Sequence, residues 1–348
     1  MRLNPSIVGI AVTLIGVMAT LAALWQVRRS NSSRIRAVTF LGIGLLGIAI
    51  LIVVLGDSTV TYLFSAVFLG LSGGLVMPSL VTVAGQVPGV SRGRALASYT
   101  VALSVSLAIG PVFESLVLGG TRGSLKIALL SFLPLLVIAS LFVGFMAFQT
   151  RTSLDSDQLV SSGSLISENL HLRTAIVAVI LYQIPFTAIT AFGALIALNA
   201  YHVSLSLMQV PFTVFFLVSF GARSALVWKP PVRRSTVLLQ VAAIVTLVGL
   251  VMIGVGHGYV YLLVAMGILG LPHGLIYPVS ISLVSQGTDK ASLAKANSIL
   301  YGAMNTVSFI VPLLLGLVAS YFGYRDMILL VLIPVAILTW MLFKLNID

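Results

Sequence analysis

Uninterrupted apolar segments recur along the whole chain, and they restrict its possible folds more than any other feature. Each is about 20 residues long, and a helix of that length crosses a hydrocarbon core of roughly 30 Å. Only helices and closed barrels satisfy their backbone hydrogen bonds in lipid, and barrel strands would alternate in polarity, which these segments do not. The composition agrees, because 59% of the residues are hydrophobic and only 8% are charged. The sequence therefore predicts an all-α polytopic membrane protein.

Most connections between the apolar segments are short, but residues 148–173 form a polar, Ser-rich stretch without a long apolar run. We interpret it as a linker between an N-terminal helical bundle at 1–147, with five spans, and a C-terminal bundle at 174–348, with six. The eleven expected spans are 7–26, 37–56, 59–84, 95–119, 127–147, 174–199, 207–228, 236–256, 259–286, 296–321 and 326–343.

Lys and Arg are divided unequally between the two alternating sets of loops. Fourteen of the 19 lie in one set and four in the other, while Arg223 lies inside a span. Cytoplasmic loops carry an excess of basic residues, so we expect the first set to be cytoplasmic. In the plasma membrane this orientation places 148–173 and the C-terminus inside and the N-terminus, as given, outside. The same excess accounts for the net charge of +11, so nucleic acid is not an expected partner.

A ten-residue stretch occurs twice, 200 residues apart. Residues 69–78 read LGLSGGLVMP and residues 269–278 read LGLPHGLIYP, with six identical positions. Such a repeat indicates two related halves. The offset maps the first three spans onto the seventh, eighth and ninth, and the fourth onto the tenth after a shift of one residue. Mapped spans cross the membrane in the same direction, which predicts parallel repeats. Span 174–199 has no counterpart.

This plan resembles the Major Facilitator Superfamily of secondary transporters, whose two bundles are joined by a charged cytoplasmic linker. The stretch 69–78 is similar to that family's fourth helix, and 269–278 to its tenth. The residues RGRA at 92–95 resemble the basic loop before the fifth helix, and IGP at 109–111 the Gly-Pro of that helix. The stretch 233–238 resembles the end of the basic loop between the eighth and ninth helices.

The chain departs from the family pattern in three respects. The family's first helix has no equivalent, which predicts a vacancy related to 174–199 by the pseudo-two-fold axis. The loops 28–36 and 223–234 lack the acidic residue of the family's short cytoplasmic motif. After Gly110 and Pro111 the chain reads VFES, where the antiporter group has two glycines after two variable positions.

Two charged residues lie inside predicted spans. A carboxylate in lipid costs several kcal/mol unless it is paired or protonated, so Glu114 is a candidate for proton coupling. The alternative is hydration of Glu114 near the outer interface. Arg223 lies about five residues from the cytoplasmic end of its span, where interfacial anchoring competes with a gating or anion-binding role. The two residues are near opposite ends of their spans, so we expect no direct pair.

Polar side chains near mid-membrane outline a candidate substrate cavity. In the family, the helix matching 174–199 lines the cavity, and here four of its central residues are polar or amphipathic. These side chains would hydrogen-bond a mostly apolar or aromatic solute, or else form ordinary interhelical hydrogen bonds. His273 is also a second proton-relay candidate. The cavity candidates are Tyr182, Gln183, Thr187, Thr190, His273, Tyr277 and Asn305.

Small residues and prolines form a group of gating or packing candidates. Glycines four apart share a helix face and let two helices approach closely, either as a surface that glides between states or as static packing. The prolines either bend helices around the cavity or are tolerated kinks. Together with Arg223, the group comprises Gly70, Gly74, Pro78, Gly110, Pro111, Gly270, Gly274 and Pro278.

No pattern in the sequence predicts an enzyme. There is no Ser-His-Asp arrangement, phosphate loop or metal-ligand spacing, and there is no cysteine, so no metal or cofactor is expected. The low charge of the spans favours an amphipathic or weakly polar solute. We predict a monomeric secondary active transporter, surrounded by lipid, that exports a small organic solute by proton-coupled alternating access. A metabolite uniporter or symporter and a non-transporting receptor or scaffold are the alternatives.

Overall fold

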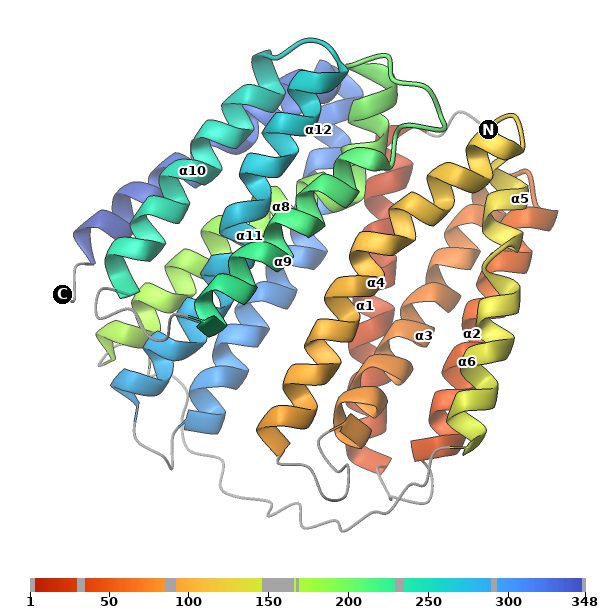
Figure 1. Ribbon diagram of the computed structural model, residues 1–348, viewed down its shortest axis with the longest axis horizontal. Coiled ribbons are helices and arrows are strands. Elements are labelled where there is room, and N and C mark those ends of the chain that lie inside the picture. The colour runs from red at the N-terminus through yellow and green to blue at the C-terminus, as the bar shows by residue number, and fades with distance from the viewer. Residues whose placement is uncertain are drawn as a thin grey trace. The chain divides into compact units, whose positions relative to one another are not determined.

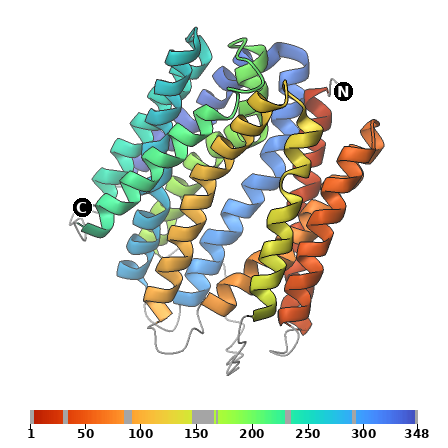
Figure 2. The ribbon, with the colours of Figure 1, turned by 45° about the vertical axis from the view of Figure 1, so that its right-hand side comes forward.

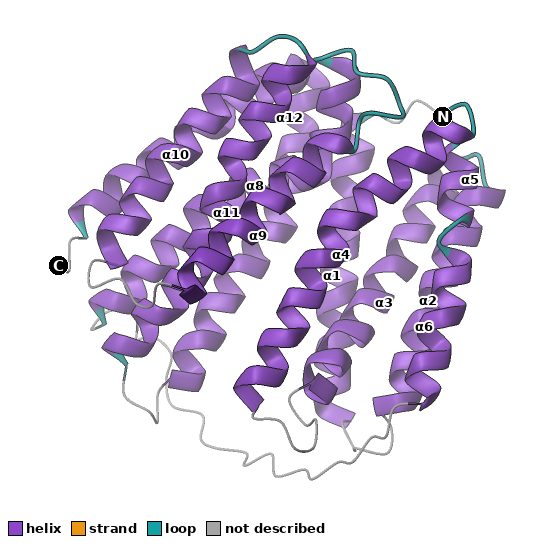
Figure 3. Cartoon of the chain, viewed as in Figure 1, coloured by secondary structure: helices purple, strands orange, loops and turns teal. Residues whose placement is uncertain are grey.

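The computed structural model describes residues 4–29, 35–84, 92–145, 166, 169–228, 235–288 and 293–345. Every regular element in these ranges is a helix (Figure 3). Most of the expected linker 148–173 lies outside them. The helices are α1 (Pro5–Arg29), α2 (Ile35–Leu55), α3 (Thr59–Ala84), α4 (Arg92–Gly120), α5 (Leu125–Leu130), α6 (Leu133–Phe145), α8 (Leu170–Asn199), α9 (Val210–Trp228), α10 (Ser235–Val255), α11 (Tyr259–Gly287) and α12 (Leu293–Lys344).

Nine helical segments within the described ranges are long and apolar enough to cross a membrane. The prediction of an all-α polytopic membrane protein is therefore confirmed, although the count of eleven is not. The predicted spans 296–321 and 326–343 run together as α12, and the apolar part of α9, Val210–Leu226, is shorter than a full span. Predicted span 127–147 is divided into α5 and α6 by a short turn at Ser131.

The junction inside α12 is a single residue, Gly323, with φ 85° and ψ 173°. Residues with a side chain are strained in this region of φ and ψ, so a glycine can reverse the chain there where other residues would not. Gly123, which lies 200 residues earlier between α4 and α5, has φ 82°. The two halves therefore share a glycine with positive φ at this position.

The helices form two compact units. The first comprises Met1–Ser106 with Leu116–Asp157, and the second comprises Leu107–Ser115 with Gln158–Asp348. Within the first unit α3 packs against α1 and α2, and α2 also packs against α6 (Figures 1 and 2). Within the second, α11 packs against α8, α9 and α10, and α8 packs against α12. The expected bundle boundaries at 147 and 174 stay a prediction.

The repeated glycines lie at close helix contacts in both units. A Cβ atom added at any of the four would collide with a backbone carbonyl oxygen of the neighbouring helix, α1 for α3 and α9 for α11. The carbonyl groups that these glycines contact in the first unit lie 200 residues before those contacted in the second. Each pair of helices is therefore repeated together with its close contact. The pairs are Gly70 with Ile15, Gly74 with Ala19, Gly270 with Phe215, and Gly274 with Ser219.

Helix α8 is the most enclosed of the nine segments. Of its most apolar window, 61% is buried, against 50% for α11 and 11% for Leu125–Phe145. Side chains on α8 therefore reach the core of the second unit, where α11 and α12 meet it.

Candidate substrate site

His273, on α11, lies among four aromatic side chains from α8 and α9. Its ring centroid is 4.5 Å from that of Phe186, 5.0 Å from Phe215, 5.2 Å from Tyr182 and 5.8 Å from Phe216. The imidazole stacks almost parallel to the Phe186 ring, at 16°. Only 8% of the surface of His273 is exposed. We call these five residues the His273 cluster.

Arg223 determines which nitrogen of His273 carries the proton. The close approach of α9 and α11 at Gly274 brings Arg223 Nη2 to 3.2 Å from His273 Nε2 and 3.5 Å from its backbone oxygen. A guanidinium group has donors and no acceptor, so His273 Nε2 must accept this hydrogen bond. The proton of the neutral imidazole then resides on Nδ1. Tyr277, one turn further along α11, interacts electrostatically with Arg223.

Two buried polar atoms of the His273 cluster have no hydrogen-bond partner in the described part of the chain. They are His273 Nδ1 and the hydroxyl oxygen of Tyr182. A buried donor left unpaired costs about 1–3 kcal/mol, so both atoms require an acceptor. A cavity of about 10 Å³, room for about one water molecule, lies beside Tyr182, Phe186 and Phe215.

Two prolines line the same small cavity. Pro185 lies inside α8 and Pro272 inside α11. Proline lacks the backbone N–H, so each helix loses one hydrogen bond to the preceding turn and is easier to bend there. The predicted helix-bending residues Pro78 and Pro278 lie inside the continuous helices α3 and α11.

Gln183 faces α12 and forms an interhelical hydrogen bond. Its Nε2 donates to Ser308 Oγ at 2.8 Å and to Thr187 Oγ1 at 3.4 Å, while its Oε1 has no partner in the described ranges. Thr190 is exposed and donates to the backbone oxygen of Phe186 at 2.9 Å. Asn305 is half-buried on α12, three residues before Ser308. Of the seven cavity candidates, Tyr182 and His273 therefore belong to the His273 cluster, and Gln183 lies at the contact of α8 with α12.

Glu114 is half-buried near the end of α4. Its Oε1 accepts a hydrogen bond of 3.3 Å from Gln209 Nε2, just before α9 begins, and both residues belong to the second unit.

Near Pro111 on the same helix, a Cβ atom added at Gly110 would meet nothing within 4 Å, unlike the four repeated glycines. In the described ranges no group of three His, Cys, Asp or Glu residues is arranged to hold a metal ion.

Several residues of the site were not singled out by sequence reasoning. Phe215 and Phe216 lie in a uniformly apolar span, where no local pattern distinguishes a residue that contacts His273 from one that faces lipid. Phe186 follows Tyr182 by four residues, one helical turn, and this spacing could have indicated a shared face. Gln209 lies inside the predicted span 207–228, but helix α9 begins only at Val210, so Gln209 is in the loop before it.

Comparison with known proteins agrees with the architecture. The sequence model of the Major Facilitator Superfamily matches residues 2–294. No match was found among curated protein sequences. Among solved structures, the nucleoside transporter NupG is similar with a TM-score of 0.79 and 12% identity, over 99% of this chain and 91% of that chain.

Two further structures are similar over most of their length. For a bacterial homologue of the human lysosomal transporter Spinster, inward-facing and occupied, the TM-score is 0.73 with 13% identity, over 99% of this chain and 89% of that chain. For the human organic anion transporter MFSD10 the TM-score is 0.62 with 16% identity, over 97% of this chain and 83% of that chain. At such identities the likeness is one of fold.

Proposed function

This chain belongs to the Major Facilitator Superfamily, and from that membership we propose that it is a secondary active transporter of a small organic solute. Transport would proceed by alternating access, with export coupled to proton entry. The His273 cluster is the observation that carries the proposal, because it combines unpaired donors with aromatic walls inside the second unit.

The chemistry of the cluster favours a particular kind of solute. His273 Nδ1 and the Tyr182 hydroxyl are two donors without a partner in the described ranges, and the positive charge of Arg223 lies on the other side of the same imidazole. An oxygen acceptor, either a carbonyl or a carboxylate, would satisfy them. The rings of Phe186 and Phe215 add stacking of about 0.5–1.5 kcal/mol for a flat apolar body. We therefore propose an aromatic solute that carries an oxygen acceptor.

Phe186 is the side chain that must move to admit such a solute. It is the partly exposed ring of the cluster, it stacks on His273, and it follows Pro185, where α8 has lost a backbone hydrogen bond. A bend of α8 at this proline would withdraw the Phe186 ring and leave its place on the imidazole to the ring of the solute. The small cavity beside the cluster would enlarge in the same movement.

Glu114 is the proposed coupling residue. Its described hydrogen-bond partner is an uncharged amide, so the carboxyl group can gain or lose a proton without breaking an ion pair with that partner. Gln209 adjoins the first turn of α9, the helix that also carries Arg223, Phe215 and Phe216. A change in the charge of Glu114 would therefore act on the beginning of a helix that lines the site.

His273 could relay protons only in a state in which its hydrogen bond with Arg223 is broken. A protonated imidazole would otherwise direct its Nε2–H donor at the Arg223 guanidinium, which has donors only.

Transport by the full-length chain in proteoliposomes tests the site. The two probe solutes are a nucleoside and an aromatic carboxylate, chosen after the structural neighbours. We expect His273→Phe, which keeps the stacking and removes the donor, to lower apparent affinity by about ten-fold or more. Thr190→Val is the matched control, since Thr190 is exposed and bonded to its own helix, and it should leave affinity unchanged. Equal affinity in His273→Phe would exclude the cluster as the binding site.

A second experiment separates coupling from movement of the solute. In Glu114→Gln we expect loss of accumulation driven by a pH gradient and retention of solute exchange between the two sides. Retained gradient-driven accumulation would show that Glu114 does not couple protons. If neither probe moves in the unaltered chain while binding to it is measurable, the receptor interpretation is favoured instead.

A further inference from the structure

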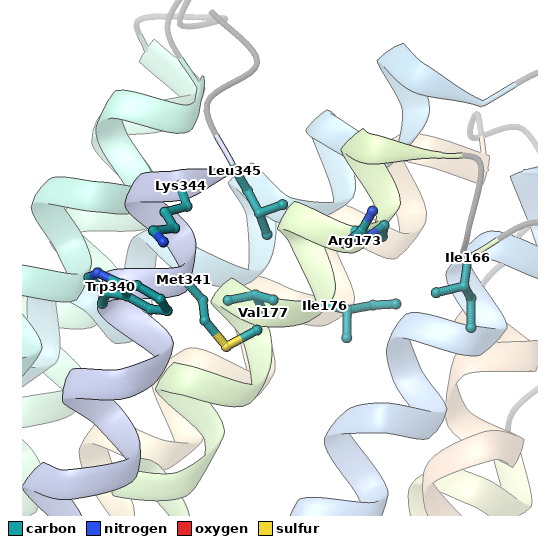
Figure 4. A pocket seen from close by; sticks show the side chains of 8 residues that line it. All are labelled: Ile166, Arg173, Ile176, Val177, Trp340, Met341, Lys344 and Leu345. Atoms are coloured by element: carbon teal, nitrogen blue, oxygen red, sulfur yellow. The ribbon is translucent and has the colours of Figure 1, made fainter.

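A groove of about 410 Å³ lies on the second unit, where α8 begins and α12 ends (Figure 4). The side chains of Val177, Ile176 and Met341 form its floor, and Trp340 closes one end. A long hydrogen bond from Thr174 Oγ1 to the backbone oxygen of Leu345, at 3.5 Å, joins the two helix ends. The groove therefore combines the first turns of α8 with the last turns of α12, and its floor is apolar.

Two cations border this apolar groove. Arg173 and Lys344 are both exposed, and neither forms an ion pair with a carboxylate in the described part of the chain. Lys344 Nζ lies 3.9 Å from the centroid of the Trp340 ring, and 58% of the Trp340 surface is exposed. Tryptophan and long basic side chains are typical of the level at which a membrane span meets the lipid headgroups.

The position of the groove determines what kind of ligand can fill it. Its floor belongs to Leu170–Asn199 and Ile299–Lys344, two segments long and apolar enough to cross a membrane, and its cations lie at their ends. We therefore expect the floor to face hydrocarbon and the cations to lie at the headgroups. A ligand that matches both parts has an apolar chain on one side and an anionic group on the other. The basic loops predict that this end is cytoplasmic, and the cytoplasmic leaflet is the one that carries anionic lipid.

We propose that this groove binds an anionic glycerophospholipid of the cytoplasmic leaflet. Arg173 and Lys344 bind the phosphate of the headgroup, and one acyl chain lies along Val177 and Met341. The site is separate from the His273 cluster, and it does not depend on which solute the protein moves.

Native mass spectrometry of the full-length protein, released from neutral detergent, tests the proposal. The probes are phosphatidylglycerol and phosphatidylcholine with identical acyl chains, and we expect phosphatidylglycerol to bind more tightly. Each basic residue near a membrane surface contributes enough binding energy for about a fivefold change in affinity. Arg173→Gln and Lys344→Gln should each weaken phosphatidylglycerol binding by about fivefold, and the double variant by about 30-fold. Phosphatidylcholine binding should not change.

Two further variants separate the groove from general charge effects. Arg36→Gln removes an exposed cation from the start of α2, in the other unit, and should leave binding unchanged. Val177→Trp fills the floor without changing the charge and should prevent binding of the acyl chain. Melting curves check that each variant is folded, and the two glutamine variants, at exposed positions, remain informative if Val177→Trp is not.

Three results would overturn the proposal. One is equal affinity for phosphatidylglycerol and phosphatidylcholine, and another is unchanged phosphatidylglycerol binding in the double variant. The third is that free glycerol phosphate displaces the bound lipid at the same concentration at which added phosphatidylglycerol displaces it. That result would indicate a site for a soluble phosphate and not for a lipid.

Discussion

Arg223 controls the chemistry of a neighbouring side chain at the scale of the single residue. Its guanidinium donates to Nε2 of His273 and so leaves the Nδ1 proton available to a ligand. We regard Arg223 as a positioning residue, because its contact with the solute would be indirect. Anchoring at the membrane interface, the alternative considered from the sequence, does not require the contact between Arg223 and His273. Positioning predicts that a variant of Arg223 changes solute affinity, and anchoring predicts that it does not.

Substitution of Arg223 distinguishes positioning from anchoring. Arg223→Met should raise the KM for the aromatic carboxylate by about ten-fold with little change in maximal rate, because the imidazole can then adopt either tautomer and the positive charge beside it is lost. Arg223→Lys keeps a donor and should restore part of the affinity. The measurement is initial uptake into proteoliposomes over a range of solute concentrations. An unchanged KM in Arg223→Met would assign the residue to anchoring.

Gly74 and Gly73 provide a matched pair of adjacent glycines on α3. A Cβ atom at Gly74 would collide with the backbone of Ala19, whereas one at Gly73 would meet nothing within 4 Å. We expect Gly74→Ala to destabilise the protein by about 1–3 kcal/mol, since the backbone of α1 would have to shift. Gly73→Ala should be neutral or stabilising by up to about 1 kcal/mol, because alanine favours the helix. Denaturation midpoints in detergent compare the two, and equal midpoints would contradict the close contact.

At the scale of the element, α12 is two helices joined at Gly323. Its φ of 85° with ψ of 173° is accessible to glycine and strained for any other residue. Gly323→Ala should therefore cost about 1–3 kcal/mol of folding free energy. Gly302 is the control on the same element, because a Cβ atom there meets nothing within 4 Å and its φ is not positive. Equal melting temperatures for the two alanine variants would contradict this account.

Arg325 joins the ends of three helices beyond that junction. Its Nη1 donates to the backbone oxygen of Gly256 at 2.6 Å and its Nη2 to that of Ala200 at 2.9 Å. The guanidinium also lies 5.1 Å from the ring centroid of Tyr201, whose hydroxyl donates to the backbone oxygen of Ile253 at 2.8 Å. These bonds connect the loop after α8 and the end of α10 to α12.

The Tyr201 hydroxyl makes this junction sensitive to alkali. Burial raises the pKa of Tyr201 above its ordinary value, and the nearby charge of Arg325 opposes that shift more weakly. The stability that follows from the raised pKa is present below about pH 10 and is lost as the pH rises through the folded-state value. Melting temperatures between pH 8 and pH 11 should fall more steeply for the unaltered protein than for Tyr201→Phe. Parallel curves would contradict a buried, protonated Tyr201.

At the scale of the whole molecule, the sequence predicted the class of fold because hydropathy reports directly on contact with lipid. It also predicted close helix contacts at Gly70 and Gly274, although it did not say which helices they would meet, since that depends on tertiary packing. The count of eleven spans is not confirmed, because the predicted spans 296–321 and 326–343 follow each other through the single residue Gly323 with no polar loop between them. The aromatic neighbours of His273 could not be predicted either, because Phe215 and Phe216 resemble residues that face lipid.

The predicted orientation of the chain can be tested by cysteine labelling, since the sequence contains no cysteine. Ser204 is exposed between α8 and α9, and Ser285 is exposed near the end of α11. We expect a membrane-impermeant maleimide to label Ser204→Cys on intact cells, and Ser285→Cys only after permeabilisation. The unaltered chain is the control. The opposite pattern would reverse the orientation inferred from the basic loops.

The duplicated contact between glycine and carbonyl has a consequence for how this chain can change over evolutionary time. The nearest atom that a new side chain would strike at Gly70, Gly74, Gly270 and Gly274 is a backbone carbonyl oxygen, which no second mutation can remove. A larger residue there would require the neighbouring helix to move, so we expect these positions to accept few substitutions. The facing residues differ in type between the two copies, with Ile15 in place of Phe215 and Met18 in place of Val218. The two halves therefore resemble each other most at the glycines where two helix backbones are in contact, and they differ in the side chains around those contacts.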